Sequence, residues 1–245
     1  MGDISRDYIN IDKTIGKARN RVRRIGIELE GGWTKKLPPG TRLVHDGSVR
    51  FPQDVAIKLN GGQGELPSPP LDLTMFAGWI ETYYPQIVNE TCGMHIHLSF
   101  KNALTYQRLM NPKYPATILA YITKWAKDEK LVRNHPIWER LRGENEYCKH
   151  QFWADEQVKR IEKDHDRMRN GNRYTIINYS YGVHSTLECR LLPMMVDAKQ
   201  ATRAIQNIID TTNAFLVVTA AREEKVKIVR EVDEEILRNT RKIYV

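Results

Sequence analysis

The chain has 245 residues and a formal net charge of +8, and 41% of its residues are hydrophobic. This length fits one large domain or two small ones, and the hydrophobic and aromatic content is too high for a disordered chain. No segment approaches the roughly 20 consecutive apolar residues that a membrane-spanning helix needs. We therefore expect a soluble globular protein.

Residues 1–24 hold seven basic and three acidic residues, so we predict a basic leader over residues 1–23. It is either an arm for nucleic acid or another anionic partner, or an ordinary solvated segment. It lacks the apolar region of a secretory signal. The three cysteines are too few and too scattered for a disulfide scaffold, so we expect a reducing, cytoplasmic setting.

The first predicted strand covers residues 24–30, where aliphatic residues alternate with Gly26, Glu28 and Glu30. A period of two places both glutamates on one face of the strand. The following pair, Gly31-Gly32, is expected to break this strand.

Residues 42–46 predict a second strand, which ends in a turn at Asp46-Gly47-Ser48. A glycine-rich segment then opens a short extended piece around Glu65, and the prolines of residues 67–70 end it. Glu65 is thus the third acidic side chain expected on an extended segment.

Apolar residues at helical spacing predict a helix from Asp72, as its N-cap, to about Asn89, and Pro85 is expected to kink it or end it early. Residues 94–100 then predict a strand. One face of that strand carries the polar side chains of His95, His97 and Ser99.

Residues 103–170 are heavily charged and mainly helical in pattern, so we expect an inserted or peripheral helical block there. Strands are predicted again at residues 173–180 and 186–192. Asp197 is then expected to cap a long helix, and residues 223–245 have the pattern of an exposed amphipathic helix.

Strands and helices do not alternate one by one along the chain, which favours an α+β fold over a doubly wound one. We predict a largely antiparallel sheet with helices packed on one side. A single catalytic domain would cover residues 24–222, with the helical insertion at residues 103–170 and a charged C-terminal helix at residues 223–245.

The chemically informative feature is a set of acidic and imidazole side chains on predicted strands. The set comprises Glu28, Glu30, Glu65, His95, His97 and Glu188. If these side chains converge, the carboxylates repel one another unless cations neutralise them, which predicts bound divalent metal. A carboxylate-rich site with imidazole suits Mg²⁺ or Mn²⁺ better than structural zinc.

Five motifs in this order and spacing resemble the amidoligase family of the glutamine synthetase and glutamate-cysteine ligase superfamily. The motifs are GIELEG, HDGS, GELPSP, CGMHIHLSF and NRYTIINYSYGVHSTLECRLLP. The resemblance covers residues 24–100 and 165–216. It implies a glutamine synthetase-like catalytic sheet with the carboxylate-amine ligase fold, and ATP-dependent condensation of a carboxylate with an amine through an acyl phosphate. Small-molecule or peptide carboxylates and amines are the implied substrates, with Mg²⁺ or Mn²⁺.

The resemblance also implies roles for individual residues. Metal-ligand positions of the superfamily match Glu28, Glu30, Glu65, His95 and Glu188. His97 and Ser99 match positions beside the nucleotide, so the resemblance implies that they bind ATP, and His97 is a weaker candidate for the metal.

Arg190 matches the arginine that meets the transferred phosphate, where a planar guanidinium can hold oxygens bidentately. Arg173 and Asn178 fall in the segment ahead of it, where contact with phosphate or substrate is implied. Asp46 and Ser48 match the DGS turn of the family, which either orients a substrate amine or carboxylate or is a simple Asp-Gly turn.

Two other functions are compatible with the sequence. One is a different metalloenzyme built on His95-x-His97 and a glutamate, although such sites usually recruit a third histidine or an aspartate. The other is a non-enzymatic module that binds nucleic acid or a protein partner through residues 1–24 and the arginine-rich helical block. Binding to nucleic acid would weaken steeply with salt, whereas ATP turnover would depend chiefly on divalent cation.

Overall fold

The structure is a computed structural model that describes residues 21–101, 105, 108–150, 174–179 and 186–243, with side chains up to residue 224. Most of the predicted basic leader therefore lies outside the described residues. In chain order the named elements are β1 (Val22–Trp33), α2 (Gln53–Ala56), β2 (Gly62–Pro67), β3 (Leu71–Asp72), α3 (Phe76–Tyr83), β4 (Gly93–Phe100), α5 (Lys113–Asp128), α6 (Ile137–Arg142), β5 (Ile177–Asn178), β6 (Leu187–Pro193) and α9 (Ala198–Ile243).

The strands form one six-stranded sheet in the order β2-β1-β4-β6-β5, and β3 pairs with β1 as well. Every pair of neighbouring strands in this sheet is antiparallel. The predicted α+β class and the largely antiparallel sheet are therefore confirmed.

The expected break at Gly31-Gly32 was wrong, because β1 continues through both glycines to Trp33 and pairs with β2 along this stretch. Both glycines are required because other segments of the chain pack closely against the strand at these positions. A Cβ on Gly31 would come 2.5 Å from Pro85, and one on Gly32 would come 2.8 Å from Leu59. Glycine lowers strand propensity, but here its missing side chain lets two segments pack directly on the sheet.

The strand expected at residues 42–46 is reduced to one bridge, in which the backbone groups of Val44 and Glu65 exchange hydrogen bonds of 2.8 and 2.9 Å. Gly64 makes this approach possible. Its φ is +143°, and a Cβ there would lie 2.2 Å from the Val44 carbonyl oxygen. The bridge holds the segment before Asp46 beside β2.

The helix expected from Asp72 is shorter than predicted. Asp72 belongs to β3, where its carboxylate accepts a hydrogen bond from Arg24 Nε at 2.9 Å. The helix α3 ends at Tyr83, because Tyr84 adopts the extended conformation that the following Pro85 favours. The alternative that Pro85 ends the helix early is thus confirmed.

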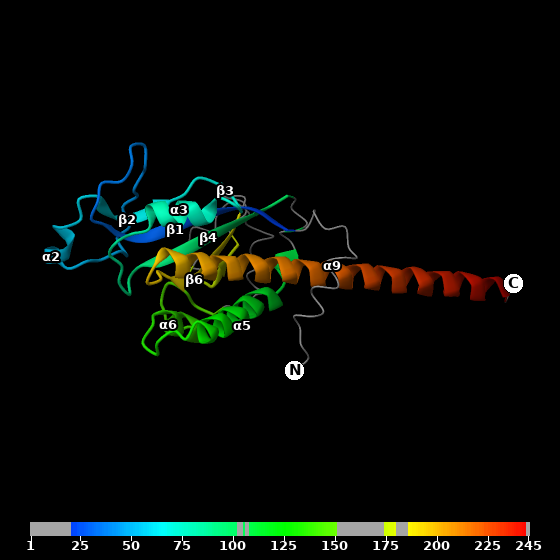
Figure 1. The fold of residues 1–245 in the computed structure, drawn as a ribbon. Coiled ribbons are helices and arrows are strands. Elements are labelled where there is room, and N and C mark those ends of the chain that lie inside the picture. The colour runs from blue at the N-terminus through cyan, green and yellow to red at the C-terminus, as the bar shows by residue number, and fades with distance from the viewer. Residues whose placement is uncertain (1–20, 102–104, 106–107, 151–173, 180–185, 244–245) are drawn as a thin grey trace.

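The helix α9 lies between α3 and α5 and packs against both of them (Figure 1). Its first turn is capped as predicted, because Gln200 N donates a 2.7 Å hydrogen bond to Asp197 Oδ1. The buried face of α5, including Ile118 and Ile122, belongs to the same core as the strands. The described helices of the middle block are therefore part of the main core and are not peripheral to it.

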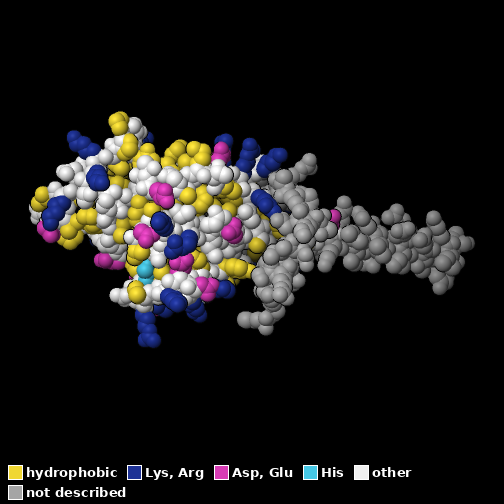
Figure 2. Space-filling view, in the orientation of Figure 1, with side chains coloured by type: hydrophobic (Ala, Val, Ile, Leu, Met, Phe, Trp, Pro, Cys, Tyr) yellow, Lys and Arg dark blue, Asp and Glu magenta, His cyan; other side chains and the backbone are white. Residues whose placement is uncertain are grey.

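The helix α9 runs without interruption from Ala198 to Ile243, so the predicted division near residue 223 is not a break in the helix. Its C-terminal part extends beyond the other elements (Figure 1). Among the described residues, no helix combines the length and the apolar character needed to cross a membrane. Basic and acidic side chains are interspersed over the described part of the face that Figure 2 shows.

Candidate functional site

The acidic and imidazole side chains lie on one face of the sheet, and the strand register brings them together. Glu30 is paired with Glu65, Glu28 with His95, and His97 with Glu188. Side chains on the opposite face of these strands, such as Ile27 and Ile96, are buried in the core. The acidic and imidazole side chains thus occupy the face of the sheet opposite these core residues. Cys189 lies between Glu188 and Arg190 and is fully buried in the core, as the alternation of the strand requires.

His95 is the centre of the cluster. Its Nδ1 lies 3.0 Å from Glu28 Oε2 and 3.6 Å from Glu188 Oε1, and its Nε2 lies 3.6 Å from Glu30 Oε1. The imidazole, Glu30 and Glu188 are all buried. Three carboxylates from two strands therefore converge on one largely buried imidazole ring.

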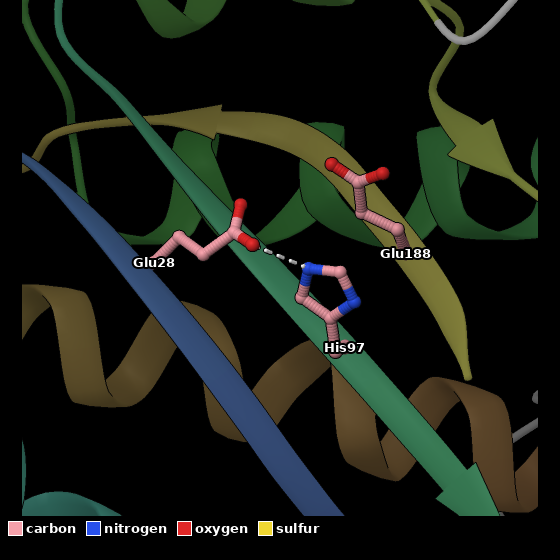
Figure 3. A group of neighbouring side chains, drawn as sticks. All are labelled: Glu28, His97 and Glu188. Atoms are coloured by element: carbon pink, nitrogen blue, oxygen red, sulfur yellow. Dashed lines mark hydrogen bonds and ion pairs between the residues drawn. The ribbon is translucent and has the colours of Figure 1, made fainter. Parts of the chain in front are cut away.

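His97 contacts Glu28 from the next position on that face. Its Nε2 lies 2.9 Å from Glu28 Oε1, and its Nδ1 lies 3.1 Å from Thr186 Oγ1. Figure 3 shows the ring directed toward Glu28, with the carboxylate of Glu188 on the neighbouring strand. His97 therefore joins the cluster, and its predicted role in ATP binding stays a prediction.

Three overlapping groups of these side chains bring one ligand atom each to within 4.8 Å of the others, close enough to hold a metal ion. The groups are Glu28, His97 and Glu188; Glu28, Glu65 and His95; and Glu30, Asp46 and Glu65. Carboxylate oxygens with one imidazole nitrogen are ligands that suit Mg²⁺ or Mn²⁺. These side chains could thus hold a metal ion.

Glu65 has a raised pKa. Burial, with the neighbouring charge of Glu28, raises the pKa of Glu65 from 4.5 to about 7. At neutral pH this carboxyl group is therefore partly protonated in the absence of a cation. A divalent ion beside it would restore the charged form.

Glu28 and Glu188 shift in the opposite direction. Burial raises the pKa of each carboxyl group. The hydrogen bonds and charges of His95 and His97 together outweigh burial at Glu28, and the combined charges of Arg190 and the two histidines outweigh it at Glu188, so both pKa values lie below the usual value. Burial lowers the pKa of His97, but its hydrogen bond to Glu28 and the charges of the surrounding carboxylates together raise it above the usual value. His97 thus favours its charged form beside the carboxylate of Glu28.

A cavity of about 70 Å³ opens at one end of the cluster. It is lined by Glu30, Asp46, Ser48, Thr91, His95, Arg140, Tyr147, Tyr174 and Arg190. The cavity joins the acidic cluster to two arginines and two tyrosines. A small polar group bound in this cavity would contact both carboxylates and guanidinium groups.

Asp46 and Ser48 form the predicted turn and line this cavity as well. The backbone N–H and the hydroxyl of Ser48 both donate to Asp46 Oδ1, each at 2.7 Å. This is the local bonding of an Asx turn. The turn holds the Asp46 carboxylate beside Glu30 and Glu65.

Arg190 and Asn178 both contact Glu188. Arg190 Nη1 forms a short ion pair with Glu188 Oε1, and Asn178 Nδ2 donates to Glu188 Oε2 at 2.7 Å. The Arg190 guanidinium also lies 5.6 Å from the centre of the Tyr174 ring. Both oxygens of Glu188 are therefore oriented by neighbouring donors.

Among the described residues, one predicted position is not part of this cluster. The Ser99 hydroxyl donates to the backbone carbonyl of Arg24 at 3.1 Å, further along β4, and Ser99 does not line the cavity. Arg173 lies outside the described residues. The other predicted site residues all belong to the cluster, to the cavity or to their immediate contacts.

Several cavity residues were not assigned a role from the sequence, and Arg140 is the most unexpected of them. It comes from α6 in the middle block, where the segment IWERLR reads as an ordinary charged helix. Its exposed fraction is 4%, whereas the side chain of Arg142 on the same helix is 57% exposed. No local pattern distinguishes these two arginines.

A scan against protein-family models, a search of curated proteins and a search of solved structures each returned no match for this chain. The interpretation of the site therefore depends on its motifs and its geometry.

Proposed function

We propose that the protein is an ATP-dependent ligase that joins a carboxylate to an amine with the help of divalent metal. The observation that carries this proposal is the cluster of glutamates and histidines with Arg190 beside it. The motif resemblance to the amidoligase family supports the same function, and with it a glutamine synthetase-like arrangement of the sheet.

The donor set supports Mg²⁺ or Mn²⁺ as the bound ions. Glu28, Glu30, Glu65, His95 and Glu188 would hold them, with His97 and Asp46 as further ligands. When bound, such ions would neutralise phosphate charge and orient the phosphates of ATP. Asn178 Oδ1 is buried without a hydrogen-bond partner among the described residues, so it leaves an acceptor for a ligand of this site.

In a reaction of this class, the substrate carboxylate takes the terminal phosphoryl group of ATP, and an amine attacks the acyl phosphate and releases phosphate. Arg190 would hold oxygens of the transferred group, since its planar guanidinium can donate two parallel hydrogen bonds. Asp46 would accept a proton or a hydrogen bond from the amine. Because no protein nucleophile is needed, catalysis would depend on positioning and electrostatic stabilisation.

The test is ADP release from the purified protein with ATP and Mg²⁺ or Mn²⁺, measured against pooled amino acids, polyamines and small carboxylates. We expect ADP release that depends on the pool and is lost in Glu188→Gln. Glu81→Gln is the matched control, because Glu81 is exposed on α3. Turnover in Glu188→Gln equal to that of the wild type would contradict the proposal.

One observation favours a second function, a metal-dependent hydrolase or oxygenase without ATP. His95 and His97 lie 3.0 and 2.9 Å from Glu28, so two imidazoles and one carboxylate meet, as in the 2-His-1-carboxylate sites of mononuclear iron enzymes. The same assay separates the two proposals. Metal-dependent turnover of a substrate in the absence of ATP would favour the second.

A further inference from the structure

Arg140 is a buried cation at the edge of the sheet. β5 pairs only with Glu188 and Cys189 of β6. The carbonyls of Arg190 and Leu192 therefore lie past the end of the β5–β6 pairing. Arg140 Nη1 donates to these two carbonyls at 2.9 and 3.2 Å. The bonds fix the guanidinium at the wall of the cavity that it lines.

The charge of Arg140 is not balanced by a bonded acid. Among the described residues, its hydrogen bonds reach backbone carbonyls and no carboxylate. Glu30 lies nearby, because a Cβ on Gly93 would come 3.1 Å from both Arg140 Nη2 and Glu30 Oε2, but this Glu30 oxygen accepts its hydrogen bond from Gly93 N. A buried guanidinium without a bonded anion is unfavourable.

Arg190 brings a second guanidinium to the same cavity. One of its nitrogens, Nη1, is paired with Glu188. Another, Nε, is buried without a hydrogen-bond partner among the described residues. An unsatisfied buried donor is rare and calls for a ligand, and a guanidinium has five N–H donors to offer.

We propose that the cavity between Arg140 and Arg190 is a subsite for an oxyanion, a carboxylate or phosphoryl group of the substrate, and that Arg140 determines this specificity. This inference rests on the proposed function, because it takes the cavity as the part of the ligase site that binds the substrate. Glu30 and Asp46 also line the cavity. They would face the metal, whereas the anion would contact the two arginines. The substrate that enters is accordingly acidic.

The test follows the Arg190 Nε–H resonance by NMR while inorganic phosphate or malonate is added, with chloride at the same ionic strength as the reference. Both titrations are run with EDTA and with Mg²⁺. We expect a saturable shift with phosphate or malonate and none with chloride. The more tightly bound of the two anions identifies the group as phosphoryl or carboxylate.

Variants assign the subsite to Arg140. Arg140→Lys keeps the charge but loses the planar fork, so anion affinity should fall by about tenfold or more. Arg142→Gln, an exposed position on the same helix, is the control and should bind like the wild type. Equal affinity in wild type and Arg140→Lys, or no saturable shift in the wild type, overturns the proposal, and the wild-type result does not depend on how the variant folds.

The two proposals fail separately. Anion binding by a protein that binds no Mg²⁺ would leave this subsite standing and remove the ligase. Mg²⁺-dependent ATP turnover without any anion shift at Arg190 would overturn the subsite alone.

Discussion

Gly93 opens β4 at the point where three functional groups meet. A Cβ there would lie 3.1 Å from Glu30 Oε2 and from Arg140 Nη2, and 3.3 Å from His95 Nε2. These contacts are tighter than ordinary van der Waals contact, and the three side chains are buried and held by their own partners. The absence of a side chain at residue 93 therefore sets the spacing of the site.

We expect Gly93→Ala to destabilise the protein by about 1–3 kcal/mol, the usual range for overpacking, and to weaken metal binding. Denaturant unfolding and calorimetry with Mn²⁺ measure the two effects. Gly78→Ala is the matched control, because a Cβ at Gly78 meets nothing within 4 Å and lies within α3. A Gly93→Ala protein with wild-type stability and metal affinity would contradict this geometry.

Asn178 orients Glu188, one of the proposed metal ligands, through its hydrogen bond to Glu188 Oε2. Loss of such a supporting contact typically reduces metal affinity by about 10–100-fold. We therefore expect Asn178→Ala to bind Mn²⁺ more weakly by that factor while it still binds. Unchanged affinity in a titration of this variant would show that the orientation of Glu188 does not depend on Asn178.

At the scale of elements, α5 and α9 are joined by a buried hydrogen bond between Tyr114 and Thr212, with 2.8 Å between the hydroxyl oxygens. The Thr212 hydroxyl donates to Ile208 O, so Tyr114 is the donor in this pair. The pair lies on the core side of the sheet, away from the acidic cluster. Helix packing and site chemistry are thus carried by opposite faces of the same strands.

Tyr114→Phe should lower the free energy of unfolding by about 0.5–1.5 kcal/mol, the net contribution of one hydrogen bond, and leave Mn²⁺ affinity unchanged. Urea unfolding and metal titration of the same sample measure both quantities. A large loss of metal affinity would mean that the core contacts between helices control the site, contrary to this separation of faces.

The sequence alone predicts those elements whose signal is local. Alternation places Glu28 and Glu30 on one face of a strand, and His95 and His97 on one face of another, and both placements agree with the structure. Gly31-Gly32 misled the prediction, because propensity disfavours glycine in a strand while the close approach of Pro85 requires it. The burial of Arg140 is a tertiary effect of the short β5, so no pattern in its own helix could predict it.

At the scale of the molecule, the ionisation of the cluster couples stability to pH. Glu65 has a pKa of about 7 in the folded protein against 4.5 as the reference value. Between these values the folded protein retains a proton that the unfolded chain releases. The stabilising contribution is therefore complete below the lower value and is lost as pH rises through the upper one. The raised pKa of His97 acts in the same direction.

We expect the melting temperature of the protein in EDTA to fall between about pH 5 and about pH 8, and to fall less steeply in Glu65→Gln. Mn²⁺ competes with the proton on Glu65, so its affinity should rise over the same interval. Melting curves with EDTA and with Mn²⁺ at each pH measure both trends. The same pH dependence in Glu65→Gln and wild type would exclude Glu65 as the source.

We propose that the cluster of glutamates and histidines binds divalent cations, which in turn hold ATP. The most direct measurement is the affinity for ATP by calorimetry with Mn²⁺ and with EDTA, in the wild type and in Glu188→Gln. We predict that ATP binds the wild type only with Mn²⁺ and that Glu188→Gln loses this binding. Equal ATP affinity with Mn²⁺ and with EDTA, or no ATP binding under either condition, would contradict the claim.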